Sequence, residues 1–153
     1  MNKFIYIFFV FFYIGSAYSE SSVKAGESLI WDSENQSYTA NGDVEFQNDK
    51  FIAYADKMIA RYVEKNNKEI FTVIELFENV KIEFGDEVFR GDHAIYTRDN
   101  NIIKLTGGVS IKSPTRLLTG YELIADIDNN KRTLNSADED SLVEVLLDNN
   151  ANN

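Results

Sequence analysis

The residue best suited to acid–base or nucleophilic chemistry is His93, the only histidine of the 153-residue chain. A Ser-His-Asp triad would have to use it, and the serine would need a Gly-x-Ser-x-Gly elbow, which the sequence lacks. His93 stands in Gly-Asp-His-Ala, where a lone histidine is more typical of a solvent-facing strand residue than of a ligand or general base. We therefore predict no catalytic residues and no enzyme activity.

Asp126, Asp128 and Asn130 have the spacing that begins a calcium-binding loop. Such a loop has glycine at its sixth position and a bidentate glutamate at its twelfth, whereas this chain has Lys131 and Ala137 there. The chain contains no cysteine, so thiolate metal sites are excluded, and it has no glycine-rich phosphate loop or zinc-binding helix motif. We predict neither a metal nor a cofactor.

The first residues have the features of a secretory signal peptide. Lys3 gives a positive start, the run from Phe4 to Ile14 is unbroken and apolar, and Ala17 and Ser19 are the small residues that signal peptidase reads. We predict cleavage after Ser19; the alternative is an uncleaved anchor, for which about 20 apolar residues are needed. The expected parts of the chain are a signal peptide at 1–19, a folded domain at 20–137 and an acidic, asparagine-rich tail at 138–153.

The formal net charge of the chain is −10 at pH 7. Nucleic-acid binding depends on cationic contacts to phosphate, so this charge argues against a nucleic-acid partner. It argues equally against adsorption to an anionic membrane surface. Most of the carboxylates are expected to serve solubility.

Four related segments follow one another along the chain. Each begins with a short apolar strand sequence and turns at asparagine, and the turn asparagines are Asn35, Asn66, Asn100 and Asn129. Asparagine tolerates positive φ and closes tight turns, so each unit of about thirty residues reads as hairpins. Apolar and polar residues alternate between the turns, as in Val44-Glu45-Phe46, which is the period of a sheet with one buried face. The sequence predicts an all-β fold built from repeated hairpins.

Five short motifs occur in order along these units. They are Ala-Asp-x-Met-x-Ala-x-Tyr at 55–62, Phe-x-Asn-Val-x-Ile at 77–82, Arg-Gly-Asp-x-Ala-x-Tyr at 90–96, Leu-Thr-Gly-x-Val-x-Ile at 105–111 and Leu-x-Gly at 118–120. Their order and spacing resemble the OstA-like family of lipopolysaccharide-transport proteins, over roughly residues 24 to 135.

The resemblance implies a folded-over, V-shaped β-jellyroll with an apolar groove for lipid acyl chains between its sheets. Periodicity alone predicts only that the inward residues form a core, whereas the resemblance adds contact with lipopolysaccharide. The residues that we expect to contact lipid are Val44, Phe46, Met58, Val80, Ile82, Phe84, Tyr96, Val109, Ile111 and Leu123. Cations that could meet lipid phosphates near the groove mouths are Arg61, Lys81, Lys104, Lys112 and Arg116.

Family members stack end to end through their edge strands, so the resemblance also implies partners. These are LptC-like and LptD-like proteins and further copies of the chain in a head-to-tail homo-oligomer. The cleavable signal favours a periplasmic bridge that carries lipopolysaccharide between inner- and outer-membrane components. Two alternatives are an LptC-like component that keeps its membrane anchor and a structural jellyroll adaptor without lipid cargo.

The tail contains one more apolar stretch, residues 141–148, which fits either a last strand or a short helix. As an edge strand it could pair with a partner by β-augmentation. It could equally fold over the end of its own jellyroll.

Overall fold

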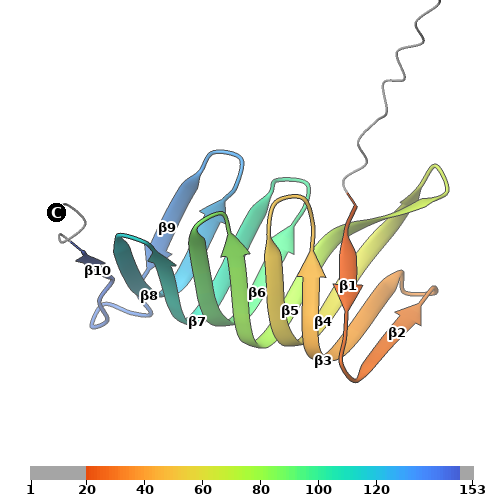
Figure 1. Ribbon diagram of the computed structural model, residues 1–153, viewed down its shortest axis with the longest axis horizontal. Coiled ribbons are helices and arrows are strands. Elements are labelled where there is room, and N and C mark those ends of the chain that lie inside the picture. The colour runs from red at the N-terminus through yellow and green to blue at the C-terminus, as the bar shows by residue number, and fades with distance from the viewer. Residues whose placement is uncertain (1–19, 149–153) are drawn as a thin grey trace, which may run out of the picture.

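All regular elements of residues 20–148, the part that the computed structural model describes, are β-strands, as predicted (Figure 1). The predicted signal peptide lies outside these residues. The strands are β1 Ser22–Lys24, β2 Ser28–Asp32, β3 Ser37–Gln47, β4 Ile52–Lys65, β5 Lys68–Phe84, β6 Glu87–Thr97, β7 Ile102–Ser113, β8 Arg116–Asp126, β9 Lys131–Asn135 and β10 Glu144–Leu147. No helix in the described range is long and apolar enough to cross a membrane.

The ten strands form one antiparallel sheet in which β3 to β8 are neighbours in sequence order. Asparagines with positive φ lie in three of the turns: Asn66 and Asn67 at 54° and 59° between β4 and β5, Asn101 at 50° between β6 and β7, and Asn130 at 50° between β8 and β9. Asn66 is one of the predicted turn asparagines, whereas Asn101 and Asn130 each follow a predicted one directly, and in the first predicted turn the residue with positive φ is Gln36. Asparagine enters the left-handed region more easily than most residues.

Each long strand bends near its middle, so the sheet is creased along a line that crosses every strand from β3 to β8. On β3, β5 and β7 the bend is a pair of residues with positive φ: Gly42-Asp43, Glu78-Asn79 and Gly107-Gly108. The strand pairing shifts register at the same places, for example between Asn41 and Val44. Gly42 and Gly107 therefore bend strands that continue beyond them.

The crease divides the sheet into two facing layers, which give the V shape visible in Figure 1. Layer 1 consists of residues 22–24, 44–55, 80–91, 109–120 and 144–147, and layer 2 consists of residues 28–41, 57–77, 93–106 and 122–135. The hairpin turns of both layers lie along the upper edge in Figure 1, which we call the rim, opposite the crease.

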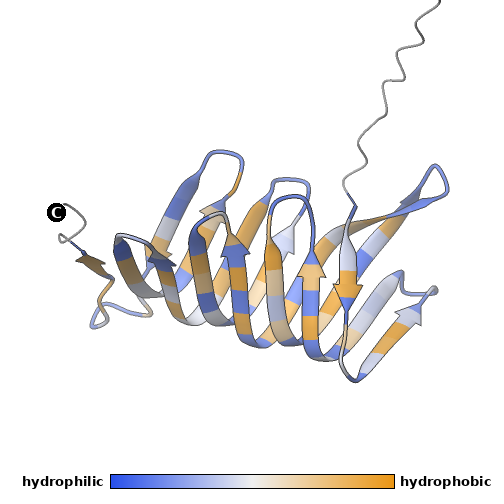
Figure 2. Cartoon of the chain, viewed as in Figure 1, coloured by the Kyte–Doolittle hydropathy of each residue, from blue (hydrophilic) through white to orange (hydrophobic). Residues whose placement is uncertain are grey.

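The core lies between the layers, because alternate residues of every strand point inward. On β7, Ile103, Leu105, Val109 and Ile111 are buried, while the residues between them are more exposed. Figure 2 shows the same alternation as bands of hydrophobic and hydrophilic residues along the strands. Across the bend the alternation resumes in the same sense, so one strand supplies inward residues to both layers.

The sheet has a free edge at each end. At one end β1 and β2 both pair with β3, one in each layer, and at the other end β10 and β9 both pair with β8. The apolar stretch of the tail is thus a strand, β10, that pairs with its own chain. It extends layer 1 by one strand and leaves its own outer edge unpaired within the described residues.

Candidate functional site

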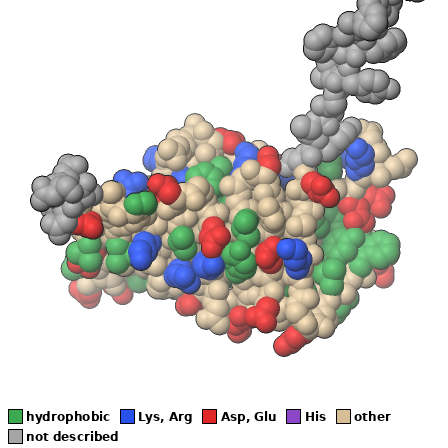
Figure 3. Space-filling view, in the orientation of Figure 1, with side chains coloured by type: hydrophobic (Ala, Val, Ile, Leu, Met, Phe, Trp, Pro, Cys, Tyr) green, Lys and Arg blue, Asp and Glu red, His purple; other side chains and the backbone are tan. Residues whose placement is uncertain are grey.

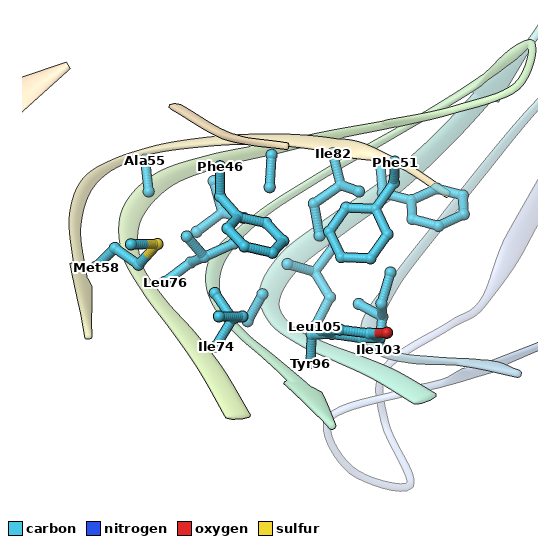
Figure 4. Packing of buried hydrophobic residues seen from close by; sticks show 14 of the residues in the cluster. Phe46, Phe51, Ala55, Met58, Ile74, Leu76, Ile82, Tyr96, Ile103 and Leu105 are labelled. Carbon is cyan, nitrogen blue, oxygen red and sulfur yellow. The ribbon is translucent and has the colours of Figure 1, made fainter. Parts of the chain in front are cut away.

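The ten residues predicted to contact lipid all belong to the space between the layers. Nine of them are buried, and Phe84, at the rim, is partly buried. Met58, Tyr96 and Leu123 come from layer 2, and the others come from layer 1. Figure 4 shows several of these side chains pointing toward one another from opposite layers.

Further residues line the same space without having been singled out from the sequence. They are Phe51, Ile74, Leu76, Phe89, Ile103 and Leu105. Ile74 with Leu76 and Ile103 with Leu105 show the same period-two alternation as the predicted residues, so the sequence contained their signal. Phe51 had none, because it follows a turn in which the Asn48 side chain accepts hydrogen bonds from the amides of Lys50 and Phe51.

The space between the layers is filled by these side chains over most of its length. Phe46, Met58, Leu105 and Leu123 are each no more than 1% exposed. The rings of Phe51 and Tyr96 meet across the gap with centroids 4.9 Å apart in an edge-to-face arrangement. An acyl chain can therefore occupy this space only if the layers move apart or the side chains repack.

The rim is bridged by polar contacts between layers at its middle. Asp128, in the turn after β8, accepts hydrogen bonds from the Asn101 side chain and from Lys50 Nζ, which lies 3.1 Å away in layer 1. These hydrogen bonds, led by that from Asn101, hold the pKa of the Asp128 carboxyl below its ordinary value. The Tyr96 hydroxyl donates to Asn101, and burial raises the pKa of Tyr96.

The rim is open beside β1, where the β4–β5 hairpin extends beyond its neighbours. A cavity of about 620 Å³ lies between Glu20 and Ser21 on one side and residues 65–71 of the hairpin on the other. A second cavity of about 190 Å³ shares Ser21, Phe71 and Arg98 with it and reaches Phe46 in the core. Of the cavities described, this second one is lined by members of the buried core, Phe46 and Tyr96.

The open cavity is lined by charged and apolar groups together. Lys65 and Arg98 line it, and neither forms an ion pair with any residue in the range 20–148. Glu69 accepts a hydrogen bond of 2.7 Å from the Tyr38 hydroxyl, and this bond raises the pKa of Tyr38 to about 12. Phe71 forms the apolar floor and packs on the rings of Tyr38 and Phe46.

Both ends of the sheet expose large apolar side chains (Figure 3). Leu29 and Trp31 on β2 lie opposite Ala40 and Tyr38 and so share their inward side. They are nevertheless about half exposed or more, because β2 is the last strand of layer 2 at that end. On β10 the exposed residues are Val145, Leu146 and Leu147.

The histidine and most of the singled-out cations lie on the outer faces of the layers. His93 Nε2 is 3.0 Å from Glu75 Oε1, and its ring packs beside Phe77. Arg61, Lys81 and Lys104 each pair with a carboxylate on an outer face, and Lys112 points outward because it follows the inward Ile111. Arg116 alone of these cations points toward the gap between the layers, where it approaches Glu87.

Residues 126–130, whose spacing resembles the start of a calcium-binding loop, form the β8–β9 turn. Asp126 accepts hydrogen bonds from the amide and side chain of Asn129, which lower the pKa of its carboxyl, and Asp128 is engaged by Asn101 and Lys50. Within the described range no three histidine, cysteine or acidic groups lie together in a way that could hold a metal ion.

A creased antiparallel sheet with an apolar interior and two free ends defines a folded-over β-jellyroll. A family model described as "LptA/(LptD N-terminal domain) LPS transport protein" matches residues 23–131, well over half of the chain. The chain therefore belongs to this family, the OstA-like family that its motifs resemble, which consists of transport proteins and not of enzymes.

Comparison with solved structures agrees with this fold. The periplasmic protein LptH from Pseudomonas aeruginosa, described as the LptA homologue of the lipopolysaccharide transport device, superposes with a TM-score of 0.69. The match covers 83% of this chain and 94% of that one at 13% sequence identity, so it shows the fold alone. A search of curated proteins found no match.

Proposed function

We propose that this chain carries lipopolysaccharide through the periplasm and bridges inner- and outer-membrane components of the transport system. The acyl chains of the lipid would lie between the two layers, in contact with the ten residues named from the sequence. Family membership supports the transport role, and the likeness to LptH, described as a periplasmic component, supports the location. The proposed cleavage after Ser19 would release the chain from the inner membrane.

The observation that carries the proposal is the continuous apolar interior. A single cluster of buried residues extends from Ala40 and Val44 on β3 to Leu123 and Ala125 on β8, and none of its members is charged. An interior with this composition gains about 0.8 kcal/mol for every methylene group of an acyl chain that it shields from water. The layers face each other along its whole length, so the same contacts recur from one end to the other.

Loading requires the layers to separate, and the fold provides a line along which they can. The bends at the crease are paired residues of positive φ, and the strand pairing is interrupted there between Phe77 and Val80 and between Thr106 and Val109. The main-chain ladders within each layer are unaffected by a change of angle at the crease. The open cavity beside β1 is the proposed point of entry, since it is lined by Phe71 and adjoins the second cavity, which reaches Phe46.

The free ends of the sheet support the proposed partners. Unpaired main-chain groups on an edge strand can bind the edge of another sheet, and exposed apolar side chains flank the edges at both ends. Pairing of the β1/β2 end of one molecule with the β9/β10 end of another is heterologous, so it can be repeated to form a chain. LptC-like and LptD-like proteins would occupy the two terminal edges.

Photo-crosslinking in living cells tests the proposal directly. A photoreactive residue at Phe46 or Val109 is expected to form a lipopolysaccharide adduct, whereas one at Glu45, which points outward and pairs with Lys24, is not. Absence of an adduct at both inward positions, in a protein shown to be folded and exported, would contradict lipid carriage.

The structural adaptor is the second candidate, and the dense packing of the interior favours it. In that case the layers never separate, and the edges alone carry the function. N-terminal sequencing of the exported protein distinguishes the LptC-like alternative from the released bridge. A mature start at Glu20 supports the released bridge, and an intact N-terminus supports the anchored component.

A further inference from the structure

An ionic cluster faces inward at the rim near the β9 end of the molecule. Arg132 on β9 lies opposite the buried Ala125, so it points into the gap from layer 2, while Glu87 begins β6 and points into the gap from layer 1. Arg132 Nη2 is 3.0 Å from Glu87 Oε2, and each side chain is only 12% exposed. It is the most buried of the ion pairs between described residues, and it joins the two layers.

Arg132 is held in place by groups other than Glu87. Its guanidinium carbon lies 4.9 Å from the ring centroid of Phe84 and 5.4 Å from that of Phe89. Its Nη1 also donates hydrogen bonds to the main-chain oxygens of Asp126 and Lys131. The guanidinium is therefore positioned whether or not the carboxylate of Glu87 is present.

A second guanidinium shares the same carboxylate. Arg116, on β8 in layer 1, has its Nη2 3.6 Å from Glu87 Oε1, and about half of its side chain is exposed at the rim. Two guanidinium groups thus face one carboxylate, which leaves one positive charge in excess at this point. The planar donor groups of arginine suit the oxygens of carboxylate and phosphate equally, and phosphate brings the additional negative charge.

We propose that Arg132 and Arg116 form a binding site for a phosphate group of the lipid, and that Glu87 occupies this site while the protein is empty. This inference rests on the proposed function and assigns the place of the lipid headgroup. The rings of Phe84 and Phe89 lie directly beneath the guanidinium and continue into the core, so the acyl chains of a bound phospholipid or glycolipid would extend into the interior.

Exchange of Glu87 for phosphate has a consequence for the layers. Glu87 follows the exposed Gly85-Asp86 turn, which allows its side chain to swing toward solvent. When it leaves, the ion pair that joins layer 1 to layer 2 at this end is broken. Binding of a phosphorylated headgroup is then coupled to opening of the rim.

The test measures the affinity of the purified mature protein for lipid A. The affinity for bisphosphorylated lipid A is compared with the affinity for dephosphorylated lipid A. Arg116→Gln and Arg132→Lys are expected to weaken binding of the phosphorylated form about tenfold, since hydrogen bonds between charged groups are lost, and to leave the dephosphorylated form unchanged. Glu87→Gln is expected to strengthen binding of the phosphorylated form severalfold because a competitor is removed. Arg90→Gln is the matched control: Arg90 is exposed and follows the inward Phe89, so the variant removes one charge on the outer face of layer 1 and is expected to change nothing.

The possible results separate the site from the function. Equal binding of both lipid forms by the unaltered protein, or equal effects of the arginine variants on both, would overturn the phosphate site and leave lipid carriage intact. Failure of the unaltered protein to bind either form would overturn both. Inorganic phosphate is tested alone: if it binds as tightly as the phosphorylated lipid and Arg116→Gln abolishes this, the site belongs to free phosphate. Arg116 is half exposed, so this variant serves if Arg132→Lys fails to fold.

Discussion

The two parts of the rim differ in what lies between the layers. Beside β1 the layers are separated by a cavity of about 620 Å³ lined by Lys65 and Arg98, which have no carboxylate partner in the described range. Near β9 the layers are joined by Arg132 and Glu87, and two aromatic rings fill the space below. The same repeat therefore produces an open and a closed region, and the difference arises from single side chains at the rim.

The largest expected effect is at the closed region, where Phe89→Ala should lower the free energy of unfolding by about 4 kcal/mol. Phe89 is completely buried, and its ring also supports the Arg132 guanidinium. Urea denaturation measures the change. Leu142→Ala, at a residue that is 86% exposed, is the control and should stay within about 0.5 kcal/mol of the unaltered protein. A loss below 1 kcal/mol for Phe89→Ala would show that this end is less tightly packed than described.

The second effect compares the two ion pairs that join the layers. Glu87→Ala leaves Arg132 nearly buried without its carboxylate and should cost about 3 kcal/mol. Lys50→Ala breaks a pair whose side chains are 30% and 54% exposed and should cost less than about 1 kcal/mol. Equal losses by denaturant unfolding would show that the difference in burial between the two pairs does not set their contribution to stability.

A third effect concerns pH at the open region. The pKa of Tyr38 is about 12 in the folded protein against an ordinary value near 10, because its hydroxyl donates to Glu69. The neutral phenol is favoured by the fold, so its contribution to stability is complete below pH 10 and is lost as pH rises from there through about 12. The pKa values of both Tyr38 and Tyr96 are raised, so tyrosinate absorbance in the native protein should show more than one group that titrates above the ordinary pKa. Tyr38→Phe should remove one of these groups, and Glu69→Gln should shift the titration of Tyr38 toward lower pH.

The smallest effect is expected at Arg98, which is exposed and lines both cavities of the open region. Arg98→Gln removes no ion pair of the described residues, so stability should change by less than about 0.5 kcal/mol. Thermal unfolding checks this. A larger loss would mean that the open region is stabilised by its charge, as the closed one is.

The sequence predicted the strands, the turns and most of the interior because these depend on local rules. Alternation placed Val44, Phe46, Val109 and Ile111 on one face, and all four are buried. The crease was harder to predict: Gly42 and Gly107 indicated a break, but Glu78 and Asn79 adopt the same positive φ without glycine. Tertiary pairing imposes that conformation, and a single sequence does not report it.

The inward position of Arg132 could not be predicted from its neighbours. The stretch Lys131-Arg132-Thr133 reads as a solvated strand, and only its register opposite Ala125 turns the arginine inward. A charged residue at an inward position contradicts the expected pattern, and such positions are where a functional requirement competes with packing. Leu29 and Trp31 show the converse: they have the inward pattern but are exposed because the sheet ends beside them.

Because β3 to β8 pair in sequence order, the length of the interior depends on the number of repeats. Each of these strands contributes to both layers, and each of β4 to β7 pairs only with the strand before it and the strand after it. Neighbouring strands lie about 4.8 Å apart, so duplication of one two-strand unit would lengthen the molecule by about 10 Å without altering the cross-section. The interior can therefore be lengthened or shortened by whole units, while the end strands stay the same.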